Sequence, residues 1–566
     1  RKAFFMSRFI LFIFSFFIAA PLFCQKQKTG FDAAFAKEFF GGNPNLKESS
    51  DRFLKEAFDA YSASDLDFAS QNLCASKFLG IIDEYGKGLP QGAREYFFAN
   101  PSVLEEFIFI LSPKDNLKNV FKILSDIWAA DAENFAKYPR LAIAIAIVFD
   151  TQPFLNWPHA QVSEEFLKRE LPNPVESFKM WVAQRAKGRL LLQTERLSVE
   201  ELKYMVASLA TDEDREWVRR SVSVNISNIE KLYASVPYDY ARLKAQAYNW
   251  SGEDYRLKTI KAVGGICTDQ SYYMTEVAKI CGVPAFIFSG AGADGFHAWG
   301  AYMLKPGVWN FDVGRYEESR FVTGHTIDPQ TWEHASDHSL ESLRESFRRN
   351  GKYRANQIHT MFAGEFASKD MTAKAEAAAK AAILQDSRNI DSWMLLLRIA
   401  EDAGKSESQI CALYENAIKA FSRYPDIDAH LRTLLIKRYR DAGKDALAEK
   451  LSGSMIVKTK SSRPDIAMSF ARAELESDIA SGNADKLYSS YKRLLSGFRR
   501  DGAMCFKGIT IPIINRLLAV DNNKDPEQLI KITQQVLKPA MNSTLDANIS
   551  AVESQVAQIK ASNSEE

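Results

Sequence analysis

The spacing of apolar residues changes twice along this chain, and this change constrains the fold more than any other feature of the sequence. Before residue 195 and after residue 375, apolar residues recur at steps of three and four, as Leu117, Val120 and Leu124 do, which is typical of amphipathic helices. Between residues 264 and 316, short apolar runs alternate with glycine-rich turns, which is typical of strands. The sequence therefore predicts an α+β fold in which a central unit with a sheet lies between two helical regions.

The first helical region is assigned to residues 26–195. The segment LAIAIAIVFD, residues 141–150, is apolar throughout, so its periodicity does not distinguish a buried helix from a strand. Pro153 and Pro158 then interrupt the regular structure. We find no catalytic motif in this region.

A turn recurs in the last region, which is assigned to residues 346–550. The tetrapeptide DAGK occupies residues 402–405 and 441–444, and ASGN occupies residues 480–483, so the turn returns every 39 residues. This spacing predicts stacked helical hairpins similar to tetratricopeptide-type solenoids, whose units bury their apolar faces only against neighbours. Two roles are open for them: a concave surface that binds a protein or peptide partner, or an extension that supports the central unit.

The central unit is assigned to residues 196–345. The segment GGICTDQSYYMTEVAKICGVP begins with a glycine pair and ends in helix stop signals, so it predicts a helix that starts near Cys267. The runs AFIFSG, HAWGAYML and VWNFDVG that follow predict strands. His297 and Asp312 would then lie on adjacent strands.

These three residue types suit nucleophilic catalysis. The free N–H groups and partial positive charge of a helix N-terminus lower the pKa of a thiol, and they offer hydrogen bonds to an oxyanion. An imidazole on a neighbouring strand can pair with the thiol, and a carboxylate behind it can fix the tautomer of the imidazole. The glycine pair lets the chain turn sharply before the cysteine. The pattern therefore predicts a triad of Cys267, His297 and Asp312.

The same segments resemble the three sequence blocks of the transglutaminase-like branch of the papain-like cysteine enzymes. These blocks are Gly-x-Cys at the head of a helix that closes with Gly-x-Pro-Ala, then His-Ala-Trp, then an aromatic residue followed by Asp, and all occur here in that order. The resemblance implies that Cys267 is the nucleophile, His297 the general base and acid, and Asp312 the residue that orients the histidine. It also implies acyl transfer on amide bonds of proteins or peptides through a thioester, without a cofactor or a metal. Hydrolysis by a protease or amidase is favoured over cross-linking.

The second oxyanion donor of that family, a polar or aromatic side chain upstream of the cysteine, has no unambiguous match. Trp250 is the candidate, with Asn249 and Gln246 as alternatives in the same segment. Asp269, two residues after the cysteine, is predicted to be a first-turn carboxylate that favours the helix dipole but opposes a thiolate.

Other motifs near the centre are assigned no chemistry. GAGADG at residues 290–295 matches a dinucleotide-binding pattern, but a strand pattern rather than a helix follows it, so we predict a hairpin loop. His334 and His338 would share a helix face, yet no third metal ligand has suitable spacing. The segment YEESRFVTGHTIDPQTW, residues 316–332, is predicted to be irregular. Cys281 is predicted to be a small buried apolar residue.

The first residues predict export. An apolar run from Phe9 to Phe23 follows a start at Met6 and one basic residue, and it is shorter than the roughly 20 residues that span a bilayer. Residues 1–25 are therefore interpreted as a signal peptide of a secreted or periplasmic protein, with lipid attachment at Cys24 as an alternative. No later segment predicts a membrane span.

Composition narrows the functional classes further. Lys and Arg number 72 and Asp and Glu number 71, and the two signs are interspersed, so no surface for nucleic acid is predicted. Apart from Cys24, the cysteines are five in number and thinly spread, unlike the disulfide framework of a small secreted domain. They are Cys74, Cys267, Cys281, Cys411 and Cys505.

Two functional interpretations follow. The first is an exported cysteine enzyme that acts on a protein or peptide substrate. The alternative is a non-catalytic scaffold or binding protein that acts through its helical repeats. A sulfur within hydrogen-bond reach of the imidazole in an open cleft would favour the enzyme, and a blocked cleft would favour the scaffold.

Overall fold

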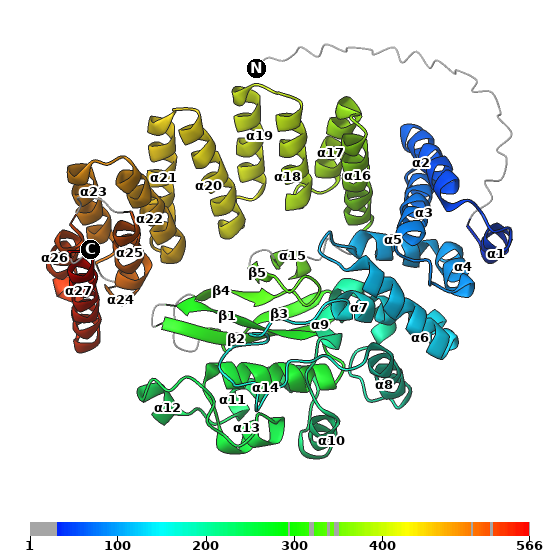
Figure 1. Ribbon diagram of the computed structural model, residues 1–566, viewed down its shortest axis with the longest axis horizontal. Coiled ribbons are helices and arrows are strands. Elements are labelled where there is room, and N and C mark those ends of the chain that lie inside the picture. The colour runs from blue at the N-terminus through cyan, green and yellow to red at the C-terminus, as the bar shows by residue number, and fades with distance from the viewer. Residues whose placement is uncertain are drawn as a thin grey trace, which may run out of the picture.

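The computed structural model of the protein describes residues 31–292, 295–315, 322–336, 340–344, 350–499, 502–520 and 525–564. This part of the chain is mostly helical and contains one five-stranded antiparallel sheet (Figure 1). The predicted signal peptide, including Cys24, lies outside the described residues. None of the described helices combines the length and the apolar character that crossing a membrane requires.

Helices α1 to α8 make up the first region. They are α1 (Ala33–Gly41), α2 (Leu46–Ser62), α3 (Leu66–Glu84), α4 (Gln91–Ala99), α5 (Pro101–Ile110), α6 (Leu117–Lys137), α7 (Pro139–Phe149) and α8 (Pro174–Ala186). The apolar segment that could have been helix or strand is α7. Every residue from Leu141 to Phe149 is buried, and because protein surrounds all faces of the helix, its sequence has no polar stripe.

The central unit continues with helices and then the sheet. The helices are α9 (Val199–Val206), α10 (Asp212–Ser221), α11 (Ile229–Ser235), α12 (Tyr240–Lys244), α13 (Leu257–Val263) and α14 (Cys267–Ile280). The strands are β1 (Ala285–Gly292), β2 (Gly295–Lys305), β3 (Val308–Val313), β4 (Val322–Ile327) and β5 (His334–Ser336), followed by α15 (Glu341–Arg344). The strand order is β3-β2-β1-β4-β5. The predicted helix at Cys267 and the three predicted strands are confirmed.

Strand β4 corrects the prediction of an irregular segment after β3. It pairs with β1 in antiparallel register, with Gly324 opposite Gly290. A Cβ at Gly324 would overlap the carbonyl oxygen of Ser289, so the strand depends on a close approach of two backbones. Residues 322–327 lack an alternation of apolar and polar residues, and their strand conformation comes from pairing with β1.

The two faces of the sheet meet different partners. A Cβ at Gly300 would overlap the side chain of Met274, and the glycine therefore lets α14 lie directly on β2. The opposite face carries the aromatic rings of the sheet, and Tyr204 of α9 packs on them. These rings belong to Phe286, Phe288, Trp299, Trp309 and Phe311. One cluster of buried apolar residues extends from Ala36 to Leu343 and includes residues on both sides of position 195.

The last region is a succession of helices. They are α16 (Gly351–Ser368), α17 (Thr372–Gln385), α18 (Ile390–Asp402), α19 (Glu407–Ala420), α20 (Pro425–Asp441), α21 (Asp445–Thr459), α22 (Pro464–Ala480), α23 (Ala484–Gly497), α24 (Gly502–Cys505), α25 (Ile511–Ala519), α26 (Pro526–Leu537) and α27 (Ser543–Ser564). Each of the three recurring turns joins two of these helices. Gly404, Gly443 and Gly482 in the turns have φ of 63°, 68° and 78°, a conformation that favours glycine after a helix.

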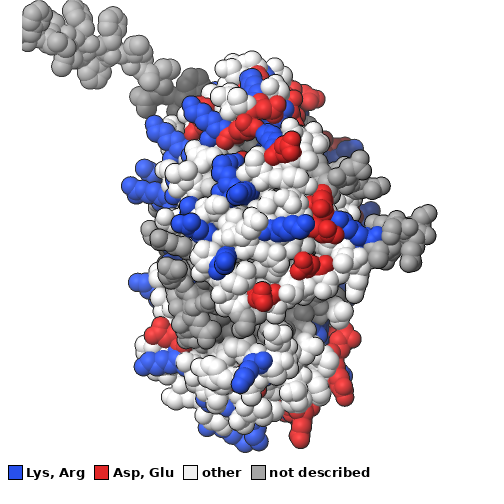
Figure 2. Space-filling model, turned by 90° about the vertical axis from the view of Figure 1, so that its left-hand side faces the viewer, with Lys and Arg blue, Asp and Glu red and all other residues white. Residues whose placement is uncertain are grey.

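Helices α16 to α23 form an arc (Figure 1). It begins beside α2 and α3, where Lys77 of α3 pairs with Glu365 and Asp67 of α3 pairs with Arg354. It ends near the loop end of β1 and β2, so the last helices return to the central unit (Figure 1). On the outer face of these last helices, basic and acidic side chains are interspersed (Figure 2).

Candidate functional site

The chain enters α14 through a crowded turn that needs both glycines. Gly264 has φ of +92°, and a Cβ there would lie 2.6 Å from the carbonyl oxygen of Pro237. At Gly265 a Cβ would overlap the side chain of Asp269. The Gly265 N–H donates to Pro237 O at 2.9 Å, and the Gly265 carbonyl accepts from the Asp239 N–H at 3.0 Å. The segment before Cys267 is thereby held between residues 237–239 and the helix.

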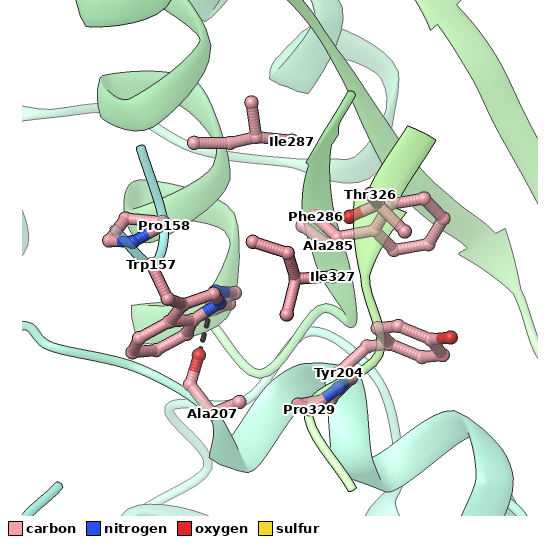
Figure 3. Close-up of a pocket in the computed structure, with 11 residues that line it drawn as sticks. Trp157, Pro158, Tyr204, Ala207, Ala285, Phe286, Ile287, Thr326, Ile327 and Pro329 are labelled. Atoms are coloured by element: carbon pink, nitrogen blue, oxygen red, sulfur yellow. Dashed lines mark hydrogen bonds between the residues drawn. The ribbon is translucent and has the colours of Figure 1, made fainter. Parts of the chain in front are cut away.

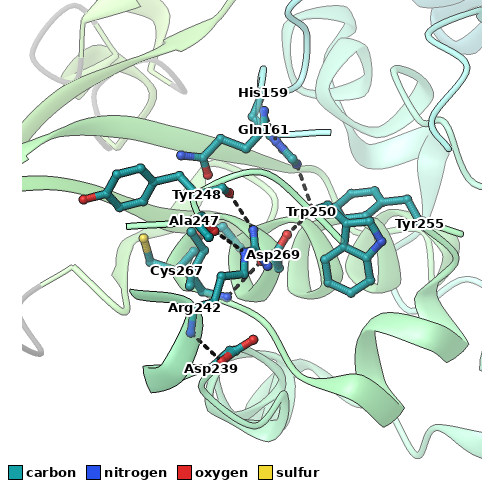
Figure 4. A network of polar contacts seen from close by, with 12 residues as sticks. His159, Gln161, Asp239, Arg242, Ala247, Tyr248, Trp250, Tyr255, Cys267 and Asp269 are labelled. Atoms are coloured by element: carbon teal, nitrogen blue, oxygen red, sulfur yellow. Dashed lines mark hydrogen bonds and ion pairs between the residues drawn. The ribbon is translucent and has the colours of Figure 1, made fainter. Parts of the chain in front are cut away.

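The side chain of Asp269 holds this turn in place. It is fully buried and accepts hydrogen bonds from the Ile266 N–H at 2.9 Å, from Arg242 Nη1 at 2.8 Å and from the Tyr255 hydroxyl at 2.7 Å (Figure 4). Burial raises the pKa of the Asp269 carboxyl, while Arg242 and the hydrogen bonds act in the opposite direction. The carboxylate predicted in the first turn of the helix is thus buried, and it joins this turn to Arg242 and Tyr255.

The network extends to His159, which comes from the segment after α7. The oxygen of Tyr255 donates its proton to Asp269, so it accepts from His159 Nε2 at 3.0 Å. Nδ1 of His159 in turn accepts from the Gln161 N–H at 3.3 Å. Burial lowers the pKa of His159 to about 3, so its imidazole is neutral and the tautomer is fixed. The start of α14 and the segment with Gln161 are therefore held together.

Cys267 and His297 line one cavity of about 710 Å³. The cavity lies between the N-terminus of α14, the strands β1, β2 and β4, and the segment after α7. Gln161, His325 and His334 also line it. The structure therefore places two of the three predicted catalytic side chains at one site.

The environment of the Cys267 thiol differs from that of a bare helix terminus. Burial raises the pKa of the thiol above its usual value, and the nearby Asp269 charge acts in the same direction. Polar contacts with the Ala298 N–H and with Thr268 act against these effects. Because burial has the largest effect, the resting thiol is protonated at neutral pH.

The His297 imidazole is held by a backbone carbonyl. Its Nε2 lies 2.6 Å from the oxygen of Gly314, and since a carbonyl only accepts, Nε2 carries the hydrogen. In the neutral ring Nδ1 is then the free base. The ring stacks on Trp299 with centroids 6.2 Å apart. Among the described residues no hydrogen bond joins the imidazole to the sulfur of Cys267.

Asp312 is not bonded to the histidine in this structure. Its carboxylate accepts from Arg315 Nη1 at 3.0 Å, and about a third of its side chain is exposed, at 35%. The hydrogen bond that orients His297 comes instead from Gly314, two residues further along the chain. The structure thus brings Cys267 and His297 to one cavity and leaves Asp312 in an ion pair beside it.

Trp250 does not face the cavity either. Its indole N–H donates to the Asp254 carbonyl at 2.9 Å, and neither it nor the alternatives Asn249 and Gln246 lines the cavity. Gln161 does line it, and its side-chain oxygen is buried without a hydrogen-bond partner among the described residues (Figure 4). No motif marks Gln161 in the sequence, since it lies in the irregular segment after Pro158.

The histidine pair predicted near the end of the central unit has another arrangement. His334 lies on β5 rather than on a helix, and His338 lies outside the described residues. The ring of His334 packs at 90° against that of His325, with centroids 4.2 Å apart. Burial, together with His334, lowers the pKa of His325. In the described part of the chain, no group of three or more His, Cys, Asp or Glu side chains could hold a metal ion.

A second cavity near the other end of α14 is too small for a substrate. Its volume is about 20 Å³, room for a single water molecule, and Trp157, Tyr204 and Phe286 are among its lining residues (Figure 3). The Nζ of Lys279 donates there to the Ala207 carbonyl at 2.7 Å and to the carboxylate of Glu276 at 2.8 Å. The ammonium of Lys279 is thus held by two hydrogen bonds inside the fold.

The cysteines of the described residues are free thiols. None of the five cysteines in the described residues forms a disulfide. Cys281 follows the last turn of α14, where burial raises the pKa of its thiol to about 11.

Comparisons with protein-family models, with curated proteins and with solved structures found no match. Function must therefore be inferred from the residues of the cavity.

Proposed function

We propose that the cavity at the N-terminus of α14 is the site of an exported cysteine acyl-transfer enzyme of the transglutaminase-like type. The observation that carries this proposal is that Cys267 and His297 line the same cavity while a carbonyl holds the far nitrogen of the imidazole. The cavity volume of about 710 Å³ is in the range of small-molecule and peptide sites. The order of the three sequence blocks supports the same chemistry.

The reaction begins with a protonated thiol. As the sulfur of Cys267 attacks the carbonyl carbon of an amide, His297 Nδ1 takes the thiol proton and then delivers it to the leaving nitrogen. A carbon–sulfur bond forms, the carbon–nitrogen bond breaks, and an amine leaves. Water then attacks the thioester, gives one proton to His297, and releases a carboxylic acid and the regenerated thiol.

Two sets of donors face the oxyanion of this mechanism. The first N–H groups of a helix have no partner within the helix, and Cys267 is the first residue of α14. The second donor in this proposal is the Nε2–H group of Gln161, which lines the cavity, in place of Trp250. Among the described residues no hydrogen bond joins the sulfur to the imidazole, and such bonds commonly tighten only when substrate is bound.

Water is the acceptor that the surroundings of His297 favour. The histidine also lines a third cavity, of about 200 Å³, together with Gln270, Tyr238 and Tyr240. This polar space adjoins the imidazole, so water can reach the thioester from it. We therefore favour hydrolysis over cross-linking.

The experiment is site-resolved alkylation by iodoacetamide, followed by mass spectrometry across pH 5 to 10. Cys281 is an internal control at the opposite end of the same helix. We expect Cys267 to react faster than Cys281 at pH 7, and we expect His297→Ala to slow Cys267 at least tenfold while Cys281 keeps its rate. His325→Ala, in the same cavity, should not reproduce this loss. Equal alkylation rates at Cys267 and Cys281, or an unchanged rate of Cys267 in His297→Ala, would contradict the proposal.

A binding function of the helical repeats is the second candidate. One observation favours it: a surface cavity of about 560 Å³ lies between α17, α18 and α19. Its apolar lining includes Trp393 and Leu396, and Lys380 and Lys419 stand at its border. If Cys267 is unreactive in the alkylation experiment, this cavity becomes the site to test, by Trp393 fluorescence during titration with acidic apolar peptides.

A further inference from the structure

The C-terminal helices contribute one residue to the cavity that contains Cys267. This residue is Lys507, which lies on a π-helical turn, Phe506–Thr510, between α24 and α25. Phe506, Ile509 and Thr510 of this turn are buried, whereas Lys507 is exposed. The ammonium group is therefore carried on a packed turn that belongs to the C-terminal helices.

The π-helical turn has a cause in the sequence. Pro512, near the start of α25, has no N–H to donate to the carbonyl of Gly508, so regular α-helical hydrogen bonding does not continue through this segment. Gly508 lies against α22, where an added Cβ would be 3.2 Å from the sulfur of Met468. The turn is thus fixed by packing, and with it the position of Lys507.

Lys507 has no counter-charge in the part of the chain that the structure describes. No Asp or Glu is among the described residues that line the cavity, and Lys507 is their only lysine or arginine. No hydrogen bond or ion pair engages Lys507 in this part of the chain. Other cations of the C-terminal helices do have acidic partners, as Lys486 has in Asp478 and Lys560 in Asp525.

Two phenylalanine side chains are among the residues that line the cavity. Phe296, next to His297, is 92% exposed, and Phe154 is half-buried. An ammonium without an ion-pair partner attracts an anionic group more strongly than a neutral one. It also has no protein carboxylate to release before it binds that group.

We infer that this site takes acyl donors that carry a carboxylate, and that Lys507 binds the carboxylate. The inference rests on the proposed acyl-transfer function of Cys267. The carboxylate belongs either to an acidic side chain next to the scissile amide or to a free C-terminus. Lys507 is thus a specificity-determining residue that the C-terminal helices supply to a site on the central unit.

The first test compares an anionic with a neutral alkylating reagent on the full-length protein. The ratio of the rates of Cys267 with iodoacetate and with iodoacetamide cancels changes in thiol pKa, because both reagents meet the same thiolate. We expect Lys507→Gln to lower this ratio about two- to fourfold, as a single charge does across roughly 10 Å at low salt. Lys507→Glu should lower it further, and 1 M NaCl should reduce these differences.

The matched control is Lys437→Gln. Lys437 is exposed on α20 and lines none of the described cavities, so its loss should leave the ratio unchanged. An equal ratio in wild type, Lys507→Gln and Lys507→Glu would overturn the inference while the reactivity of Cys267 still supports the proposed function. A Cys267 that reacts with neither reagent faster than Cys281 would overturn both.

The second test distinguishes the two sources of the carboxylate with three thiol-reactive peptides. N-chloroacetyl-glutamic acid α-amide carries a side-chain carboxylate, N-chloroacetyl-glutamine carries a C-terminal one, and N-chloroacetyl-glutamine amide carries neither. A preference of Cys267 for the first or the second over the third, lost in Lys507→Gln, supports the inference and names the source. No preference for either anionic peptide overturns it.

Discussion

Removing Arg242 from the buried ion pair at the start of α14 should destabilise the fold by several kcal/mol, because Asp269 is then left as a buried charge without a cation. The side chains of Arg242 and Asp269 are 6% and 0% exposed. Besides its contact with Asp269, Arg242 donates to the Ala247 carbonyl at 3.0 Å and to the Tyr248 carbonyl at 2.6 Å. Arg242→Ala therefore removes three hydrogen bonds and leaves a buried carboxylate without its cation.

The expected cost is about 3–5 kcal/mol, the usual effect of breaking a buried ion pair from one side. Arg242→Lys keeps a positive charge near Asp269 but lacks the planar set of donors, so it should cost about 1–2 kcal/mol for the two lost carbonyl bonds. In the double variant Arg242→Ala with Asp269→Asn, no charge remains buried. We therefore expect its cost to be about 2 kcal/mol less than the sum of the two single variants.

The ionisation of Asp269 determines whether the destabilisation caused by Arg242→Ala increases or decreases with pH. Its pKa in the folded protein is already raised, and without Arg242 it rises further. Stability contributed by a group with a raised folded pKa is present at low pH and is lost as pH rises through that pKa. The penalty of Arg242→Ala should thus be smaller at pH 4.5 than at pH 8.

The assay is urea unfolding followed by tryptophan fluorescence at these two pH values. A penalty below about 1 kcal/mol for Arg242→Ala, or one that is the same at both pH values, would refute the assignment of Asp269 as a buried charge held by Arg242. Alkylation of Cys267 in the same variants reports whether loosening the turn changes the thiol.

Two further predictions concern stability. Gly264→Ala should destabilise the fold by at least about 2 kcal/mol, because φ is +92° and a Cβ would lie 2.6 Å from Pro237 O. The control Gly351→Ala in α16, with open space around the Cβ, should cost nothing. Thermal unfolding compares the two variants, and equal melting temperatures would contradict the account of the turn. Burial raises the pKa of Asp115 to about 6, so its carboxyl destabilises the fold progressively as pH rises from 4 through 6. The melting temperature of Asp115→Asn relative to wild type should then be higher at pH 7 than at pH 4.5, and a difference independent of pH would rule this out.

Local signals in the sequence predicted much of the fold. The glycine pair and the stop signals defined α14, and the glycine of each recurring turn marked the end of α18, α20 and α22. These features act within a few residues, so the sequence displays them directly. Strand β4 has no such signal, since its pairing with β1 is a tertiary contact through Gly324.

The residues of the candidate site also fall into those that local sequence patterns predict and those that only tertiary contacts bring to the cavity. Cys267 and His297 could be predicted because each sits in a local pattern that fixes a helix start or a strand. The carbonyl of Gly314 could not, because every residue has a carbonyl and only the bend after β3 brings this one to the imidazole. Gln161 and Lys507 reach the cavity from segments far away in sequence, and no spacing rule connects them to Cys267.

The position of Asp269 explains how a rigid turn and a reactive thiol can coexist. Its carboxylate accepts the Ile266 N–H and so fixes the backbone that presents Cys267, but the same charge raises the thiol pKa. Arg242 Nη1 donates to the same carboxylate oxygen, Oδ2, at 2.8 Å and carries the compensating charge. Because the guanidinium offsets the field of the carboxylate, the turn gains three charge-assisted hydrogen bonds with less opposition to the thiolate than an unpaired aspartate would cause. Burial then remains the largest cause of the raised pKa of the Cys267 thiol.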